Sequence, residues 1–221
     1  MKGIRFFQLD GKTLGVAFDP LKCNLNCCFC WPLYECPNTR VINEVSLRDV
    51  NPFEIEWLLV GIQGEPLMNV DLLRELDEYF VRAKWVLVTN GTLQVPYDIR
   101  HRIVQLRVGF KLWYDECCEQ FIGLRDYRRI VVRNVKRWLS EGLRVAIEMC
   151  PRIHASCCAP RILAFAKRWK LPVILQPYMD NHCIPKSPYH PAFPIETLND
   201  VCDKQALDCD LPTEYGSTDL Q

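Results

Sequence analysis

The sequence lacks an excess of either charge, a long apolar run and an export signal. Its 27 Lys and Arg residues balance 27 Asp and Glu residues, which gives no general reason to expect binding to nucleic acid or to a membrane surface. No stretch approaches the ~20 apolar residues of a membrane-spanning helix. The N-terminus has no charged start followed by an apolar run. We therefore expect a cytoplasmic protein with neither a nucleic acid nor a membrane as partner.

Cysteine, by contrast, is abundant, with 13 residues in a chain of 221. Without export, clustered cysteines indicate metal binding rather than a disulfide framework. Cys23, Cys27 and Cys30 have the spacing C-x3-C-x2-C. Three thiolates on one loop can bind three irons of a cubane iron–sulfur cluster, which normally takes four cysteine ligands. The fourth iron is then open to a substrate or cofactor, and such an exposed cluster favours an anaerobic setting.

Strand and helix patterns alternate along the rest of the chain. A hairpin is expected over residues 4–8 and 13–18, and residues 32–54 are expected to be irregular with at most one short helix. Further strands are expected at 55–62, 85–88, 104–112, 143–149 and 171–175. Helices are expected after Asn69, more weakly after Pro96, from Tyr127 to a stop at Gly142, and from Pro160 to about Trp169.

This order predicts an α/β fold with a parallel sheet and right-handed crossovers. We count six parallel strands after the opening hairpin, too few for a closed eight-stranded barrel. The expected fold is therefore a partial, open (β/α)6 barrel over residues 1–177. Residues 178–221 are rich in proline and are expected to form an irregular C-terminal arm of the same domain.

Polar or glycine-containing residues follow successive predicted strands. They are Gln63-Gly64-Glu65-Pro66, Thr89-Asn90-Gly91-Thr92, Lys111 and Gln176. Each run alone is an ordinary turn sequence. In parallel α/β folds, however, active residues lie at the carboxyl ends of the strands. Their joint placement, together with the cysteine loop after the first strand, predicts one binding site at that end of the sheet.

In these residues the chain resembles the radical S-adenosylmethionine (radical SAM) superfamily. The resemblance covers roughly residues 13–177 and is carried by Cys23-x3-Cys27-x-Phe29-Cys30, by Gly64-Glu65-Pro66 and by the barrel order. It implies a [4Fe-4S] cluster on Cys23, Cys27 and Cys30, whose open iron chelates S-adenosylmethionine (AdoMet). Electron transfer from the cluster then cleaves a carbon–sulfur bond, and the 5′-deoxyadenosyl radical takes a hydrogen atom from a substrate. A reductant protein such as a flavodoxin or ferredoxin is implied as partner.

The same resemblance implies AdoMet-binding roles for other residues, and no catalytic residue beyond the cluster. Phe29 would lie beside adenine, and Gly64, two residues before Pro66, would let the backbone approach the methionine amino group. Glu65 would offset a local cation, and Asn90 would hydrogen-bond the cofactor. Lys111 would pair with the methionine carboxylate or bind a ribose hydroxyl. Gln176 would contact the adenine edge or the substrate.

Two departures leave the subfamily open. Gln63 stands where the family usually has the first glycine of Gly-Gly-Glu. Gly109-Phe110-Lys111 matches only the lysine of the Asp-x-Lys found in some activating enzymes and in a deazapurine-forming branch. The chain is similar to both groups, so two enzymatic functions are expected: activation of a protein partner, or modification of a small molecule or peptide. A third, non-enzymatic function is a structural iron–sulfur or zinc protein, although zinc normally takes four ligands.

The other cysteines form no compact metal motif. The adjacent pairs Cys117-Cys118 and Cys157-Cys158 are expected to be packing thiols. A second cluster remains an alternative for a scattered set, namely Cys150, Cys157, Cys183, Cys202 and Cys209.

Overall fold

A computed structural model describes residues 3–19, 22–27, 43–149 and 158–175. The chain divides into two compact units, Met1–Ser187 and Pro188–Gln221. The second unit lies wholly outside the described residues, as does the predicted C-terminal arm. The fold given below is that of the first unit alone, and the predicted domain boundary at residue 177 stays a prediction.

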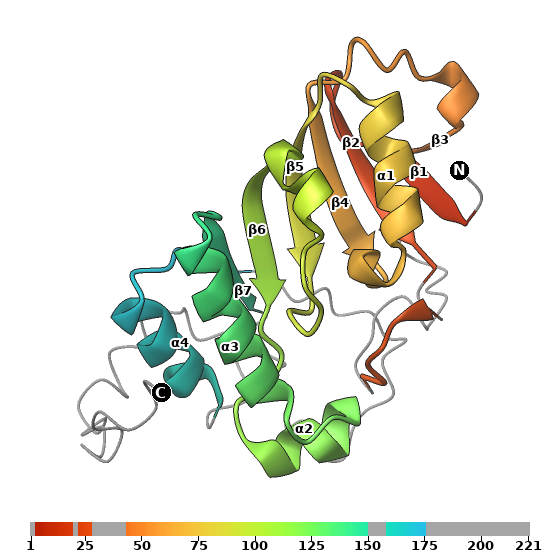
Figure 1. Cartoon of the computed structure of the whole chain (residues 1–221). Helices are drawn as coiled ribbons and strands as arrows, with labels where there is room; N and C mark the ends of the chain where they lie inside the picture. Colours follow the sequence, from red (N-terminus) through yellow and green to blue (C-terminus); the bar gives the residue numbers. More distant parts are fainter. Residues whose placement is uncertain (1–2, 20–21, 28–42, 150–157, 176–221) are drawn as a thin grey trace. The chain divides into compact units, whose positions relative to one another are not determined.

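The first unit is built on an eight-stranded sheet (Figure 1). Its strands in chain order are β1 (Ile4–Gln8), β2 (Thr13–Phe18), β3 (Asn43–Val45), β4 (Trp57–Gln63), β5 (Lys84–Thr89), β6 (Ile103–Gly109), β7 (Val145–Met149) and β8 (Val173–Leu175). In space the order is β3-β1-β2-β4-β5-β6-β7-β8. β1 pairs antiparallel with β2 and β3, and every pair from β2 to β8 is parallel. Because β3 and β8 end the order, the sheet is open, and the predicted fold class is confirmed.

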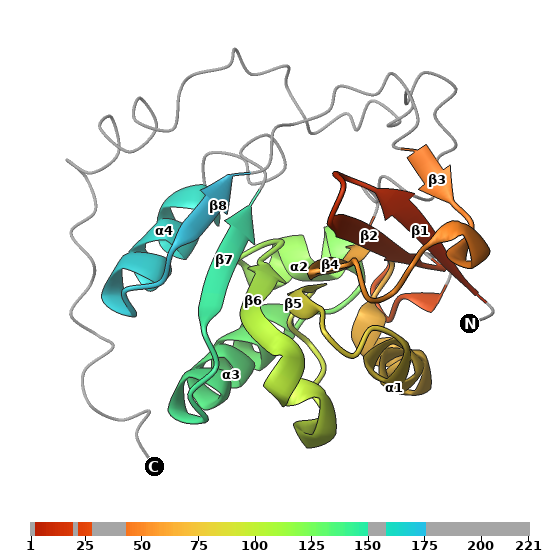
Figure 2. The same ribbon diagram turned by 90° about the horizontal axis from the view of Figure 1, so that it is seen from above.

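Among the residues that the structure describes, four α-helices and three 3-10 helices connect these strands. They are η3 (Leu47–Asp49), η4 (Pro66–Met68), α1 (Val70–Tyr79), η5 (Tyr97–Arg102), α2 (Asp115–Ile122), α3 (Tyr127–Ser140) and α4 (Cys158–Arg168). Seen from above, the strands follow an arc, with α1, α3 and α4 on its outer side (Figure 2). α2 lies beyond the carboxyl ends of β5 and β6 (Figure 1). The inner side of the arc is therefore the face of the sheet that these helices leave uncovered.

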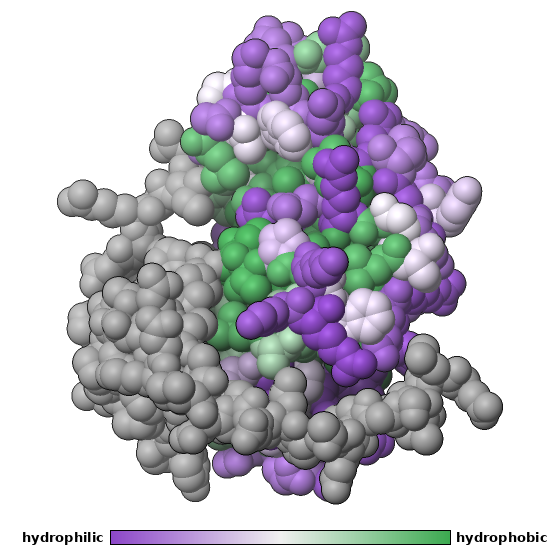
Figure 3. All heavy atoms as spheres, turned by 90° about the vertical axis from the view of Figure 1, so that its left-hand side faces the viewer, coloured by the Kyte–Doolittle hydropathy of each residue, from purple (hydrophilic) through white to green (hydrophobic). Residues whose placement is uncertain are grey.

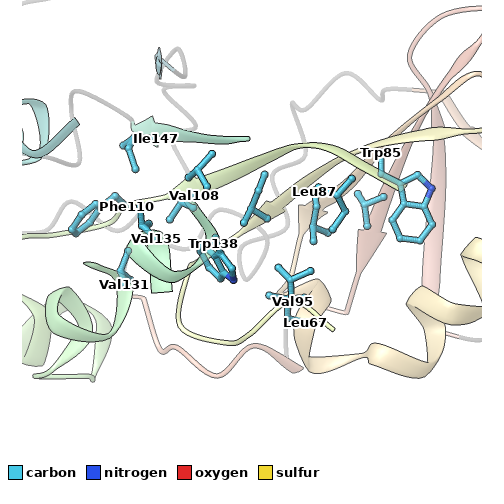
Figure 4. Close-up of a cluster of buried hydrophobic side chains, with 14 of the residues drawn as sticks. Leu67, Trp85, Leu87, Val95, Val108, Phe110, Val131, Val135, Trp138 and Ile147 are labelled. Atoms are coloured by element: carbon cyan, nitrogen blue, oxygen red, sulfur yellow. The ribbon is translucent and has the colours of Figure 1, made fainter. Parts of the chain in front are cut away.

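The hydrophobic core lies between the outer face of the sheet and the helices (Figure 4). Leu106 and Val108 alternate along β6 and are fully buried in the same cluster as Val131 and Trp138 of α3. Residues two apart on a strand share a face, so Arg107, between them, lies on the inner face. The apolar stripe of α3 was readable from the sequence, and the helix ends where Gly142 takes a positive φ of 82°.

Several sequence-based predictions need correction. Five parallel strands follow the hairpin, not six, because β2 itself is the first strand of the parallel series. The segment expected to be irregular contains β3, and the turn after Pro96 is a 3-10 helix. The strand expected to reach residue 112 ends at Gly109. α2 was missed because it is only 8 residues long and carries two cysteines among charged residues.

Polar side chains cover much of the outer surface. Figure 3 views the molecule from the side where α4 lies and shows hydrophilic residues over much of that face, with hydrophobic ones gathered near its middle. Among the helices that the structure describes, none combines the length and apolar character that crossing a bilayer requires.

Candidate cofactor site at the carboxyl ends of the strands

The structure describes seven of the ten predicted site residues. Cys23 and Cys27 follow β2, Gly64, Glu65 and Pro66 follow β4, Asn90 follows β5 and Lys111 follows β6. Phe29, Cys30 and Gln176 lie outside the described residues. Since these strands are parallel neighbours, the seven residues share one end of the sheet, as the sequence predicted.

The two described cysteines of the motif, Cys23 and Cys27, are thiols that form no disulfide. Cys27 is buried and Cys23 is half-buried. The backbone N–H of Asn26, between them, donates to the Ile122 carbonyl at the end of α2, at 3.1 Å. The side-chain amide of Asn90 lies 3.7 Å from the Cys23 sulfur and is oriented to donate to it. The cysteine segment is thus attached both to α2 and to the end of β5.

Asn90 organises the polar contacts around Cys23. Its Nδ2 also donates to Asn24 Oδ1 at 2.9 Å, and its Oδ1 accepts from the backbone N–H of Thr92 at 3.0 Å. The Thr92 hydroxyl lies 2.6 Å from the same oxygen, and Asn24 Nδ2 lies 2.7 Å from that hydroxyl. The Asn90 side chain is therefore fully engaged with the protein, and its predicted bond to the cofactor stays a prediction.

Glu65 is the most deeply buried acid of the site, with 1% of its surface exposed. One carboxylate oxygen accepts from the Leu67 N–H at 3.1 Å and from the Thr89 hydroxyl at 2.8 Å. The other accepts from the Asn90 N–H at 2.7 Å. Burial raises the pKa of Glu65 above its ordinary value, while these donors and the nearby charge of Lys111 act in the opposite direction. Glu65 thus joins the end of β4 to the end of β5.

Glycine is required where the end of β4 meets its neighbours. Gly64 has φ +69°, and a Cβ there would lie 2.9 Å from the Phe18 carbonyl oxygen at the end of β2. Pro66 then fits the first turn of η4, where an N–H is not needed. The sequence signal Gly-Glu-Pro therefore has a local structural cause: close approach, a buried acceptor and a turn start. This cause is compatible with the predicted cofactor contact and does not require it.

Tyr127, at the start of α3, joins the ends of β5 and β6. Its hydroxyl lies 3.1 Å from the Asn90 carbonyl and 2.9 Å from the Gly109 carbonyl, and it accepts from the Lys111 N–H at 2.9 Å. Burial raises the pKa of Tyr127 well above its ordinary value, so the hydroxyl keeps its proton and remains a donor. Asn134, also on α3, donates to the Gly91 carbonyl at 2.9 Å.

Sequence reasoning missed Tyr127 and Asn134 as parts of this site. Both lie on the buried face of α3, where Tyr127 was interpreted only as a core residue. A buried asparagine amid valines is a signal that a polar partner exists, but the sequence does not say which partner. Thr89 and Thr92 stood inside a motif that was recognised, and their partners emerge only from the fold.

The two described thiols, Cys23 and Cys27, are compatible with ligands of an iron–sulfur cluster. Neither is in a disulfide, both lie on one short segment, and one has an amide donor of the kind that tunes cluster-bound sulfur. Within the described residues no group of three metal-ligating side chains is found, and the third thiol of the motif, Cys30, lies outside them.

Two other described cysteines are packing thiols, as predicted. Cys118 and Cys158 are buried in the core, and the Trp113 N–H donates to the Cys158 sulfur at 3.3 Å. Burial raises the pKa of Cys118 to about 12, which keeps it an unreactive thiol. The proposed second-cluster cysteines lie outside the described residues.

Comparison with solved structures identifies the fold. One similar structure is that of TYW1 with a lysine-pyruvate adduct bound (TM-score 0.51, 18% identity, 78% of this chain and 68% of that one). Another is native anSMEcpe with bound AdoMet (TM-score 0.52, 15% identity, 76% of this chain and 53% of that one). Both are radical SAM enzymes. The chain thus has the partial-barrel fold of radical SAM enzymes and spans about half the length of anSMEcpe.

No family model matches the sequence. The search of curated proteins likewise gives no match.

Proposed function

We propose that this chain is a radical SAM enzyme. One observation carries the proposal. Cys23 and Cys27, the first two cysteines of the C-x3-C-x2-C motif, follow β2, and Asn90 at the carboxyl end of β5 donates to Cys23. Support comes from the fold, which is also that of a structure with AdoMet bound. A structural zinc or iron–sulfur protein would not need polar residues at the end of every neighbouring strand.

In this function Cys23, Cys27 and Cys30 hold the [4Fe-4S] cluster. When bound, the cluster supplies the electron that cleaves AdoMet to a 5′-deoxyadenosyl radical. The chain's own residues fix the geometry: Asn90 orients Cys23, and Glu65 and Tyr127 hold the strand ends together. These two are positioning residues.

Lys111 supplies the positive charge among the described residues of the site. Its ammonium lies 3.1 Å from the place where a Gly109 Cβ would stand, so it covers the inner side of β6. We assign it to the methionine carboxylate of AdoMet. Phe29 keeps its predicted place beside adenine, and Gln176 its predicted contact with the adenine edge or the substrate. A flavodoxin or ferredoxin as electron donor and a cytoplasmic, anaerobic setting belong to the same proposal.

Of the two enzymatic alternatives, charge on the inner face of the sheet favours modification of a small molecule or peptide over activation of a protein partner. Arg107 and Lys111 lie on or over that face, where they offer two cations to an anionic group of such a substrate.

Anaerobic reconstitution tests the function. The wild-type chain should take up about four irons, and dithionite with AdoMet should then yield 5′-deoxyadenosine. Cys23→Ala should lose both the cluster and the product, because two thiolates do not hold the cubane. Cys117→Ala is the matched control, since Cys117 lies on α2 and is not part of the C-x3-C-x2-C motif, and it should keep both. A well-loaded wild-type sample that yields no 5′-deoxyadenosine contradicts the proposal.

A further inference from the structure

The inner face of the sheet carries a cation that the site described so far does not use. Arg107 lies on β6 between Leu106 and Val108, which point into the helix-side core, so its side chain lies on the opposite, inner face. It is half-buried. A charged group on the interior side of a sheet is unusual unless a partner compensates it.

Arg107 has little compensation from the protein. Its Nε donates to the Gln105 side-chain oxygen at 2.9 Å, and Gln105 is a neutral amide on the same strand. Among the residues that the structure describes, no carboxylate oxygen lies within 4.0 Å of its guanidinium, whereas Arg74, Arg102 and Arg137 each have one. The two terminal nitrogens of Arg107 are thus available for a bidentate partner.

Arg107 lies close to the cofactor end of the sheet, beside a small residue. In the sheet register Arg107 stands between Val88 on β5 and Ala146 on β7. Ala146 is a small neighbour. Arg107 is two residues before Gly109, hence about 6.6 Å deeper in the sheet along the strand. Lys111 covers Gly109, so a molecule bound at Arg107 lies just beneath the position assigned to the cofactor.

The neighbouring charges select the kind of anion. Glu148 on β7 pairs in register with Gly109, and its carboxyl is buried on the same inner face. Of the charged side chains described on this part of the face, Arg107 and Lys111 are cationic and Glu148 is acidic. A singly charged carboxylate suits two cations beside a buried acid better than a phosphate dianion does.

We propose that Arg107 binds a carboxylate of the substrate, so that the enzyme acts on a carboxylate-bearing small molecule or peptide. The inference rests on the proposed function only in naming the bound molecule a substrate. Arg107 would hold the carboxylate through two parallel N–H···O bonds and so fix which carbon–hydrogen bond lies nearest the cofactor.

The test is protection of Arg107 from phenylglyoxal, an arginine reagent, in the reconstituted enzyme with AdoMet bound. Butyrate is the carboxylate probe, and butyramide is the uncharged control of the same shape. Butyl phosphate tests whether the site prefers a phosphate. Peptide mass spectrometry follows Arg107 and, in the same sample, the exposed Arg133 of α3. We expect saturating butyrate to slow modification of Arg107 at least fivefold and leave Arg133 unchanged, with little effect of butyramide.

Equal protection by butyrate and butyramide, equal protection of Arg107 and Arg133, or stronger protection by butyl phosphate would each overturn the carboxylate assignment. If phenylglyoxal does not reach Arg107, the midpoint of thermal unfolding is measured with and without butyrate instead. Butyrate should raise the midpoint of the wild type and not that of Arg107→Gln, and equal shifts refute the proposal.

The second measurement on Arg107→Gln separates this inference from the proposed function. The variant should bind the cluster and still form 5′-deoxyadenosine without substrate, because Arg107 holds neither cluster nor AdoMet. Loss of that product in the variant would make Arg107 a cofactor residue and overturn the inference. A wild-type chain that never cleaves AdoMet, yet shows butyrate protection, contradicts the enzymatic proposal and keeps the carboxylate site.

Discussion

Strand β4 has a glutamate beside each of its ends, and the two glutamates differ in burial and in bonding partners. Glu56 precedes the strand and forms an ion pair with Lys12 at 2.5 Å, with both side chains more than half exposed. Glu65 follows the strand, is almost wholly buried, and accepts hydrogen bonds from two backbone groups and one hydroxyl. One end of the sheet relies on solvated charges. The other has a dry, connected polar network, which is what a site that must hold a cofactor in one geometry requires.

The largest contrast is expected between Glu65→Ala and Glu56→Ala. Glu65→Ala leaves three buried donors without an acceptor and should lower the free energy of unfolding by about 4 kcal/mol. Glu56→Ala removes an exposed ion pair and should leave stability nearly unchanged. Urea denaturation of both variants measures the difference. Similar losses would mean that the two ends are not energetically distinct.

Crowding near the functional end gives the next effect. Gly61 has φ +92°, and a Cβ there would lie 2.4 Å from the Val88 carbonyl oxygen, so Gly61→Ala should cost about 3 kcal/mol. Gly142→Ala is the control, because Gly142 has φ +82° but no atom within 4 Å of its Cβ position. It should cost only the left-handed strain, about 1 kcal/mol. Thermal unfolding of the pair separates close packing from backbone conformation, and equal costs would rule out the packing contribution.

Tyr127→Phe should have a smaller effect, about 2 kcal/mol, because it removes one hydroxyl shared by backbone groups of two strand ends. Tyr79→Phe serves as control: Tyr79 packs at the edge of the core by its ring. Beyond stability, Tyr127→Phe should weaken cluster retention during gel filtration, since Asn90 and Lys111 lose a common anchor. A variant that keeps full stability would show that the hydroxyl does not connect the strand ends energetically.

The smallest expected effect is a pH dependence from Glu65. Its pKa in the folded chain is raised, so the native state holds the proton to a higher pH than the unfolded chain does. The stability that this contributes is fully present below the ordinary value near 4.5 and is lost as pH rises through the folded pKa. Thermal midpoints of the wild type should therefore fall over that window relative to Glu65→Gln. Parallel curves would refute the assignment.

The sequence predicted the architecture where local patterns carry it. The alternating strands and the apolar stripe of α3 depend on periodicity alone, and the end of α3 at Gly142 depends on one residue's backbone freedom. α2 was not predicted, because 8 residues with two cysteines show little periodicity. The parallel series does hold six strands, but the sequence placed all six after the hairpin, because pairing of β2 with β4 is a long-range choice that neither strand encodes.

For the site, the sequence identified which strand ends matter but not how their groups pair. Glu65 was predicted to offset a local cation, and the charge of Lys111 does act on it. In the structure it accepts from Asn90, Thr89 and Leu67, bonds between residues up to 25 positions apart. Arg107 gave no signal at all, because an arginine in a strand pattern is ordinary until the opposite face is known to be inward.

The hydrogen bond from the Asn26 N–H to the Ile122 carbonyl joins the cysteine segment to the last turn of α2. Deuterium uptake at that one amide would therefore report each breakage of this bond, in the chain without a cluster as well as in the reconstituted one. An amide between two thiols of the motif thus offers a native probe of access to the cluster site proposed above.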